Sequence, residues 1–115
     1  MTTAKSDVLR GTLDLMILKA LHAIGPLHGY AIARRIEQVS GQKLAINQGT
    51  IYPALVKLSR RNWIATKWGQ STTGRRVKFY AITVKGQKQL RAEEEDWQRA
   101  AGIIAKFFRL SRSSK

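Results

Sequence analysis

The sequence has no cysteine among its 115 residues. The chain can therefore form neither a disulfide nor a thiolate metal site, and it has no cysteine nucleophile. Histidine is also scarce, with two residues, and neither has Asp or Glu at metal-ligand spacing. No glycine-rich phosphate loop follows a predicted strand. These absences predict a protein that is not an enzyme and that carries no metal or cofactor.

Acidic residues are few, with seven Asp and Glu against 21 Lys and Arg, and the net charge is +14. The middle of the chain has none of them: between Gln38 and Ala92 there are eleven Lys and Arg and no acid. An ordinary solvated surface mixes charges of both signs. The single sign of this stretch therefore predicts a polyanionic partner, either nucleic acid or an anionic membrane surface.

Long hydrophobic runs are absent as well. The apolar stretch from Leu13 to Leu21 contains Asp14 and Lys19, and it falls well short of the roughly 20 residues that a membrane span needs. No small-residue cleavage site follows it. We therefore expect a cytoplasmic location. Hydrophobic residues at 43% and charged residues at 24% are typical of a globular chain, and the length favours one domain with an appended element.

Apolar residues at helical spacing predict two helices in the first third of the chain. The first runs from about Val8 to Ala23 and stops at Gly25 and Pro26, and the second runs from about His28 to Val39 with Gly41 as its stop. The short connection makes them neighbours. Their inward residues are predicted to be Leu9, Leu13, Met16, Ile17, Leu21 and Ile24, then Tyr30, Ile32, Ala33, Ile36 and Val39.

A third helix is predicted with Asn47 as its N-cap and an end near Arg61, where Asn62 can take the left-handed conformation. Pro53 leaves its start open. If Asn47 is the cap, Pro53 is the sixth helical residue and the first turn is bent or of 3₁₀ type. If the helix starts at Thr50, Pro53 lies among the free N–H positions. The predicted buried stripe is Ile51, Ala54, Leu55 and Leu58.

The last third of the chain predicts a hairpin and a long helix. Two β-rich runs, residues 63–68 and 77–82, flank a loop rich in Gly, Ser and Thr, whose tip carries Arg75 and Arg76. Thr83 then caps a helix from about Val84 to Leu110, and residues 111–115 form a polar tail. This helix would be about 40 Å long, which is longer than the body of the domain.

This order of elements defines a mainly α fold with a small β-hairpin. It is the order of a winged helix-turn-helix domain, here residues 1–83, followed by a long C-terminal dimerisation helix, residues 84–110. In such domains the third helix enters the major groove of double-stranded DNA and the wing lies along the phosphates. The alternative is that the polar side of the third helix is simply a solvated face. The predicted DNA-binding residues are Tyr30, Gln48, Gly49, Thr50, Tyr52, Lys57, Arg75, Arg76 and Lys78.

The long last helix carries an apolar seam that one chain cannot cover. The seam residues step by 7, 4, 3 and 4, which resembles a coiled coil, and they are Leu90, Trp97, Ala101, Ile104 and Phe108. A homodimer with two-fold symmetry would cover them and would suit a palindromic operator. A membrane-surface helix is the rival interpretation, and the run Glu93 to Asp96 argues against it because anionic lipid repels acids.

Four segments of the sequence resemble the PadR family of bacterial transcriptional regulators, in the right order and over about residues 8–108. They are LRGTLDLMILKAL (9–21), GPLHGYAIARRI (25–36), GTIYPALVKL (49–58) and RRVKFYAIT (75–83). The single helix after the wing is similar to the short subfamily, and this likeness implies dimerisation through that helix. Residues 59–62 depart from the family pattern, because relatives often have an acid and a glycine there, and the loss of the acid makes this region more basic.

The resemblance also implies a role for Trp97. In multidrug-sensing members, a Trp at the matching place lines a pore between the subunits, and planar aromatic ligands stack against it. A small aromatic effector is therefore one interpretation, and an ordinary dimer-core aromatic is the other. The acids before Trp97 would attract a cationic ligand, or they would pair with Arg91 and Arg99 at helical spacing.

Two functions fit these observations. The first is a dimeric, sequence-specific transcriptional repressor. The second is an architectural or nucleoid protein that binds DNA without sequence preference, which the high positive charge also supports.

Overall fold

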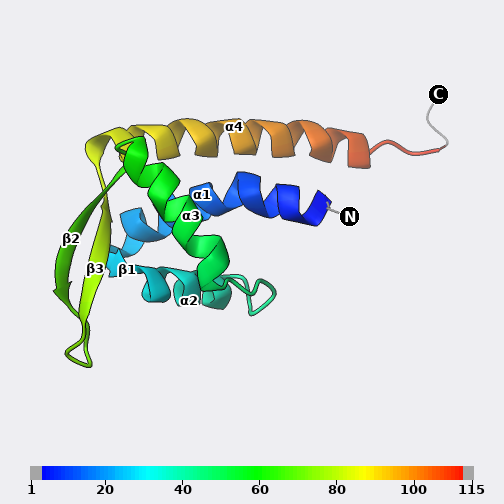
Figure 1. Cartoon of the computed structure of the whole chain (residues 1–115). Coiled ribbons are helices and arrows are strands. Elements are labelled where there is room, and N and C mark those ends of the chain that lie inside the picture. Colours follow the sequence, from blue (N-terminus) through cyan, green and yellow to red (C-terminus); the bar gives the residue numbers. More distant parts are fainter. Residues whose placement is uncertain (1–3, 113–115) are drawn as a thin grey trace.

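Four helices and a small antiparallel sheet make up the part of the chain that the computed structural model describes, which is residues 4–112, with side chains from residue 12 onward. In Figure 1 a long helix runs along one side of the shorter helices, and a hairpin projects at one end. The mainly helical winged helix-turn-helix fold predicted from the sequence is confirmed. The elements are α1 (Ala4–Ile24), β1 (Leu27–His28), α2 (Gly29–Val39), α3 (Gln48–Arg60), β2 (Ile64–Gln70), β3 (Arg76–Ile82) and α4 (Val84–Phe108).

The core lies where α1, α2 and α3 meet the base of the sheet. Most of the predicted inward residues of α1 and α2 are buried there or half-buried, but three are wrong: Ile24, Tyr30 and Val39 are exposed, Val39 to 80%. They lie at the ends of α1 and α2, beyond the elements that cover the middle of each helix. Leu18 was not predicted and is fully buried, because α1 packs against α2, α3, α4 and β3 and so has a wide buried face. The side chain of Leu9 lies outside the described residues.

The start of α3 follows the first of the two alternatives. Asn47 is the N-cap, and its Oδ1 accepts the Thr50 N–H at 3.0 Å. The N–H groups of Thr50 and Ile51 both bond to the Asn47 carbonyl at 3.0 Å, so the first turn contains a 3₁₀-type bond, and Pro53 stands inside the helix. The predicted stripe on this helix is buried, and Asn62 takes the left-handed conformation after it, with φ 63°.

The sheet has the strand order β1-β3-β2, and both pairs are antiparallel. The strands β2 and β3 are longer than predicted, because the Ser71 N–H donates to the Arg75 carbonyl at 2.8 Å and closes a short loop over residues 71–75. Gly74, at φ 84°, makes the tight turn possible. Arg75 therefore lies in the loop as predicted, whereas Arg76 is the first residue of β3.

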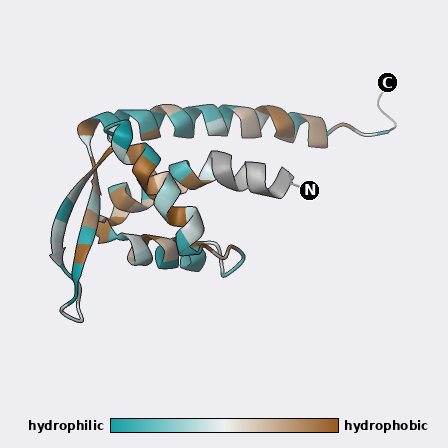
Figure 2. Ribbon diagram, viewed as in Figure 1, coloured by the Kyte–Doolittle hydropathy of each residue, from teal (hydrophilic) through white to brown (hydrophobic). Residues whose placement is uncertain are grey.

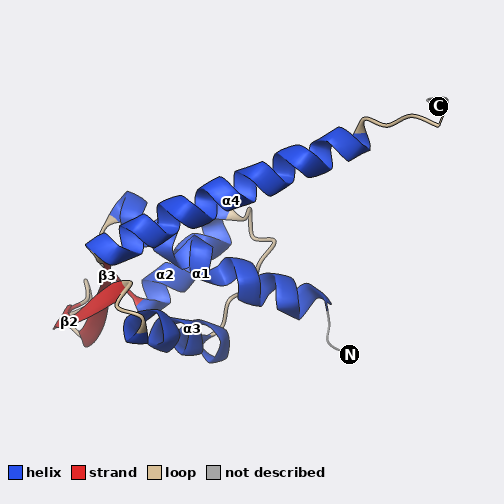
Figure 3. Ribbon diagram, turned by 90° about the horizontal axis from the view of Figure 1, so that it is seen from above, coloured by secondary structure: helices blue, strands red, loops and turns tan. Residues whose placement is uncertain are grey.

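The start of α4 is fixed to the end of α3. Thr83 Oγ1 accepts the Gly86 N–H at 2.9 Å, which confirms the predicted cap, and it donates to the Asn62 carbonyl at 2.7 Å. Gly86 packs against the Trp63 carbonyl so closely that a Cβ there would collide with it. Beyond this anchor α4 crosses α1, and its outer turns then leave the body of the molecule (Figures 1 and 3). Residues 113–115 of the predicted tail lie outside the described part.

Candidate nucleic-acid interface

The first turn of α3 presents polar groups to solvent. Gln48 and Gly49 are exposed, and Thr50 is half-buried with its hydroxyl donating to Asn47 Oδ1 at 3.1 Å. Because the Ile51 face is buried in the core, the opposite face of the helix is the one that a ligand can reach. Three of the predicted DNA-binding residues are thus brought together at the N-terminal end of one helix.

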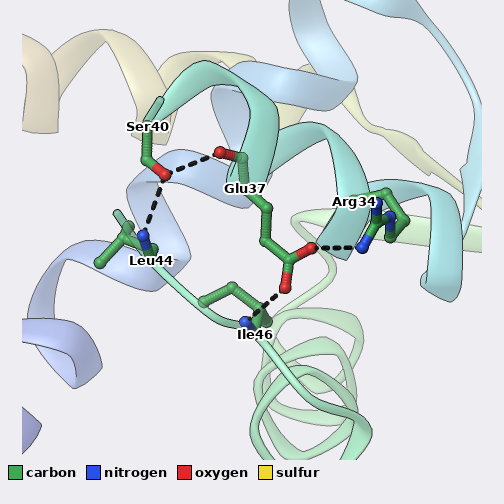
Figure 4. Close-up of polar contacts among 5 residues, drawn as sticks. All are labelled: Arg34, Glu37, Ser40, Leu44 and Ile46. Atoms are coloured by element: carbon green, nitrogen blue, oxygen red, sulfur yellow. Dashed lines mark hydrogen bonds and ion pairs between the residues drawn. The ribbon is translucent and has the colours of Figure 1, made fainter. Parts of the chain in front are cut away.

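The carboxylate of Glu37 fixes the loop that leads into α3 (Figure 4). Glu37 Oε2 accepts the Ile46 N–H at 2.8 Å, and Oε1 pairs with Arg34 at 2.9 Å. Ser40 Oγ adds two bonds, donating to the Glu37 carbonyl at 2.8 Å and accepting the Leu44 N–H at 3.1 Å. These bonds hold the loop against the end of α2, so they set the position of α3 relative to α2. Our sequence reasoning missed Glu37, although its place as the last acid before the basic stretch was a signal.

Aromatic side chains join the start of α2 to α3 and the sheet. His28 caps α2 through its Nδ1, which accepts the Ala31 N–H at 3.3 Å, and its ring stacks on the exposed ring of Tyr30 with centroids 6.5 Å apart. The Tyr52 phenol lies over Gly29, where a Cβ would come within 2.9 Å of its oxygen. Burial raises the pKa of the Tyr80 phenol above its ordinary value, and the nearby Tyr52 phenol raises it further. Tyr52 is thus packed on one side and 40% exposed on the other.

Lys57 forms an ion pair with an acid of another helix. Its Nζ lies 2.6 Å from Asp14 Oδ2 of α1, and the Asp14 side chain is only 14% exposed. The ion pair ties α3 to α1. Lys57 therefore lies at the edge of the exposed face of α3, whereas Arg60 one turn later is exposed.

The hairpin gathers cations on one face. Arg75, Arg76 and Lys78 are exposed, and the last two lie over the ring of Trp68, with Arg76 Cζ at 4.4 Å and Lys78 Nζ at 5.4 Å from its centroid. Trp68 pairs directly with Lys78 across β2 and β3 and is 53% exposed. The sequence reasoning missed Trp68, because it placed this residue at the end of a strand without assigning it a face.

Most of the predicted apolar seam lies on the outer half of α4 and is exposed to solvent. Trp97, Ile104 and Phe108 are each at least half exposed, and they border a shallow hollow with Ala101 between them. Figure 2 shows hydrophobic residues on these outer turns. Leu90 is the exception to the predicted seam: it is 3% exposed because it packs into the core of its own chain, where it also lines the groove between α1 and α2 rather than the exposed outer turns.

Three of the four acids before Trp97 contact other side chains of the chain. Asp96 pairs with Arg99 at 3.0 Å, as the helical spacing predicted, and Glu94 lies 4.0 Å from Lys19 of α1. Glu93 Oε2 accepts a hydrogen bond from Gln89 at 2.6 Å. These contacts favour the interpretation of the acids as surface pairs.

A second apolar surface lies between α1, α2 and the start of α4. It is a groove of about 500 Å³ with mainly hydrophobic walls. Lys19, Arg35 and Glu94 stand among its lining residues. Its apolar lining includes Leu15, Met16, Ala20, Ala23, Ile24 and Val39.

An exposed N-terminal turn on the third helix, a hairpin with cations and the order of the helices together define a winged helix-turn-helix regulator. The chain belongs to the transcriptional regulator PadR-like family, whose model matches residues 17–92. The family consists of DNA-binding transcriptional regulators, and the resemblance stated from the sequence is confirmed.

Two solved structures agree with this assignment, and one curated relative is similar over nearly the whole chain. A transcriptional regulator from Clostridium thermocellum is 32% identical, with a TM-score of 0.78 over 88% of this chain and 97% of that one. A PadR family regulator from Eggerthella lenta is 25% identical, with a TM-score of 0.77 over 91% and 88% of the two chains. An uncharacterized protein of Lysinibacillus sphaericus is 28% identical over 90% of this chain and 94% of its own. Within residues 4–112, no helix is both long and apolar enough to cross a membrane.

Proposed function

We propose that the protein is a dimeric, sequence-specific regulator that represses its target promoter in the cytoplasm, and that it is not an enzyme. The observation that carries the proposal is the exposed first turn of α3, which Asn47 caps and Glu37 positions. A helix held in this way can place its N-terminal side chains in the major groove. The stretch without acids supplies the positive field that draws the surface to DNA.

The predicted residues take different roles in this proposal. Gln48 and Thr50 contact base edges, because Gln can bond to adenine through two atoms and Thr to several bases. Gly49 lets the backbone come close, and Tyr52 lies beside the groove. The remaining residues hold the sugar-phosphate backbone and carry affinity without sequence information, and they are Tyr30, Lys57, Arg75, Arg76 and Lys78.

A titration tests the specificity. The protein is titrated against the DNA upstream of its own gene and against random duplex at about 150 mM salt, where a specific binder prefers its site by roughly a thousandfold or more. Gln48→Ala should relax the preference at one base step and weaken the cognate site by about 1–3 kcal/mol. Gln98→Ala, the same substitution on the exposed surface of α4, is the control and should leave the preference unchanged.

The second candidate is an architectural protein that binds any duplex. The net charge of +14 favours it, because phosphate contacts need no sequence. Equal affinities for the upstream region and for random duplex would replace the repressor with this alternative. A Gln48→Ala variant that loses affinity equally for both duplexes would make Gln48 a phosphate contact.

The dimer is proposed from two apolar surfaces that one chain leaves open. The outer turns of α4 expose Trp97, Ile103, Ile104, Phe107 and Phe108, and the groove between α1 and α2 is lined by apolar side chains. In a two-fold dimer the helix end of each chain can pack in the groove of the other chain, so both surfaces are buried in both subunits. Patches of this kind are rare on monomers.

Substitution is a better test of the dimer than truncation, because cutting the chain after Lys88 also removes Leu90 from the core. Ile104→Glu places a charge on the exposed seam and should give a folded monomer in sedimentation, with unchanged helix content by circular dichroism. Lys106→Glu, an exposed neighbour on the same helix, is the control and should stay dimeric. A wild-type protein that sediments as a monomer at micromolar concentration would contradict the proposal.

A small aromatic effector is proposed to enter between the two Trp97 side chains. The hollow beside Trp97 is bordered by Ala100, Ala101 and Ala105, whose small side chains leave space for a flat ring. A ligand there would shift the two subunits and change the spacing of the two wings. Quenching of tryptophan fluorescence by planar cationic or phenolic compounds, lost in Trp97→Ala, tests this. Silence across the panel would leave Trp97 as a dimer-core residue.

A further inference from the structure

The face of the wing that carries Trp68 is continuous with the core. Side chains alternate along a strand, so Trp68 lies on the same face of β2 as the buried Ile64, four residues earlier, and Lys78 lies on the same face of β3 as the buried Tyr80. This is the face that the helices cover at the base of the sheet. Beyond the end of the core, it is occupied by Trp68, Arg76 and Lys78.

The opposite face of the hairpin is packed at this level. The Phe79 ring packs over Gly69, where a Cβ would come within 2.9 Å of it, and it meets the His28 ring in a T-shaped contact at a centroid distance of 5.7 Å. His28 belongs to β1, which pairs with β3. Trp68, the neighbour of Gly69, therefore lies on a strand whose opposite face is covered by Phe79 and His28.

The indole interacts with two cations at once. Lys78 is its direct cross-strand partner, and Arg76 is the diagonal neighbour on the same face. Both lie over the ring within the distance at which the ring quadrupole attracts a cation, which is about 6 Å. The Arg76 guanidinium, at 4.4 Å from the centroid, is the closer one.

We propose that Trp68 is a positioning residue for DNA binding, which holds the charged ends of Arg76 and Lys78 at the places where the DNA backbone meets the wing. Free Arg and Lys side chains carry much rotamer entropy, which is lost when they pair with phosphate. The contact with the indole restricts them before DNA arrives, so less is lost on binding. The proposal rests on the proposed DNA-binding function and adds a residue to it.

The test compares Trp68→Ala in two backgrounds, with affinity for random duplex measured at about 50 mM salt. In the wild-type background we expect about two- to fivefold weaker binding, which is of the order of the ordering cost of one rotamer-rich side chain. In a chain that already carries Arg76→Gln and Lys78→Gln, we expect Trp68→Ala to have no further effect. Trp68→Tyr keeps an aromatic face and should restore most of the affinity.

The background decides between positioning and the alternatives. An equal loss in both backgrounds would mean that the indole contacts DNA itself or only stabilises the fold, and it would overturn the proposal, as would no loss in either. Thermal unfolding of each variant measures any change in stability, and Lys85→Gln, an exposed cation at the start of α4, shows the effect of losing one charge elsewhere. Random duplex reports phosphate contacts without sequence preference, so the result stands even if the promoter is not preferred. A wild-type protein that binds neither duplex would overturn both proposals.

Discussion

The loop between α2 and α3 should depend on the carboxylate of Glu37. Glu37→Ala removes the acceptor of the buried Ile46 N–H, at 2.8 Å, and also the ion pair with Arg34, at 2.9 Å. A hydrogen bond to a charged group contributes about 1.5–3 kcal/mol, and a surface ion pair at helical spacing about 0.3–0.5 kcal/mol. We therefore expect Glu37→Ala to lower the free energy of unfolding by about 2–3.5 kcal/mol.

Two further variants separate these contributions. Arg34→Ala removes only the ion pair and should lower stability by about 0.5 kcal/mol or less. Glu37→Gln keeps an oxygen that can accept the Ile46 N–H but loses the charge. Its free energy of unfolding should therefore lie between those of the other two variants. The measurement is the midpoint of urea unfolding at constant slope. If Glu37→Ala is no less stable than Arg34→Ala, then the bond to Ile46 does not fix the loop.

Three further predictions concern the wing, Gly86 and Tyr80. Changing Arg75 and Arg76 to Ala should weaken cognate and random duplex alike and reduce the slope of log affinity against log salt by up to about two, and an unchanged slope would remove both from the DNA contacts. Gly86→Ala should lower stability by about 3 kcal/mol because its Cβ meets the Trp63 carbonyl, whereas Gly102→Ala, in open space on the same helix, should be neutral or stabilising in urea unfolding. The raised pKa of Tyr80 means that the unfolded chain loses this proton at lower pH than the folded one. The contribution of Tyr80 to the free energy of unfolding is therefore fully present below the ordinary tyrosine pKa of about 10, and it is lost as pH rises from there through the raised pKa of the folded chain. Tyr80→Phe should make this fall in stability less steep.

Local signals predicted much of this fold. The caps at Asn47 and Thr83 and the left-handed Asn62 follow from the chemistry of single residues, and the stripe of α3 follows from helical spacing, so all were correct. The features that spacing did not predict depend on residues distant in sequence. Leu90 fits the seam of α4 by spacing, but α1 covers the start of that helix and buries it.

The candidate site shows the same division. Gln48, Gly49 and Thr50 were found because they follow a cap and oppose an apolar stripe. Trp68 and Glu37 were missed, since the first depends on the register between β2 and β3 and the second on a loop folding back onto α2. Periodicity within one element contains neither piece of information.

A footprint of the DNA upstream of the gene tests the central claim most directly, because it reports specificity and symmetry together. A two-fold dimer with one α3 in each major groove should protect two half-sites related by dyad symmetry, with centres about one helical turn, or roughly 10 base pairs, or a small multiple of it apart. Ile104→Glu should lose this pattern at the same protein concentration. Uniform protection along the fragment, or a single protected site without symmetry, would contradict the account.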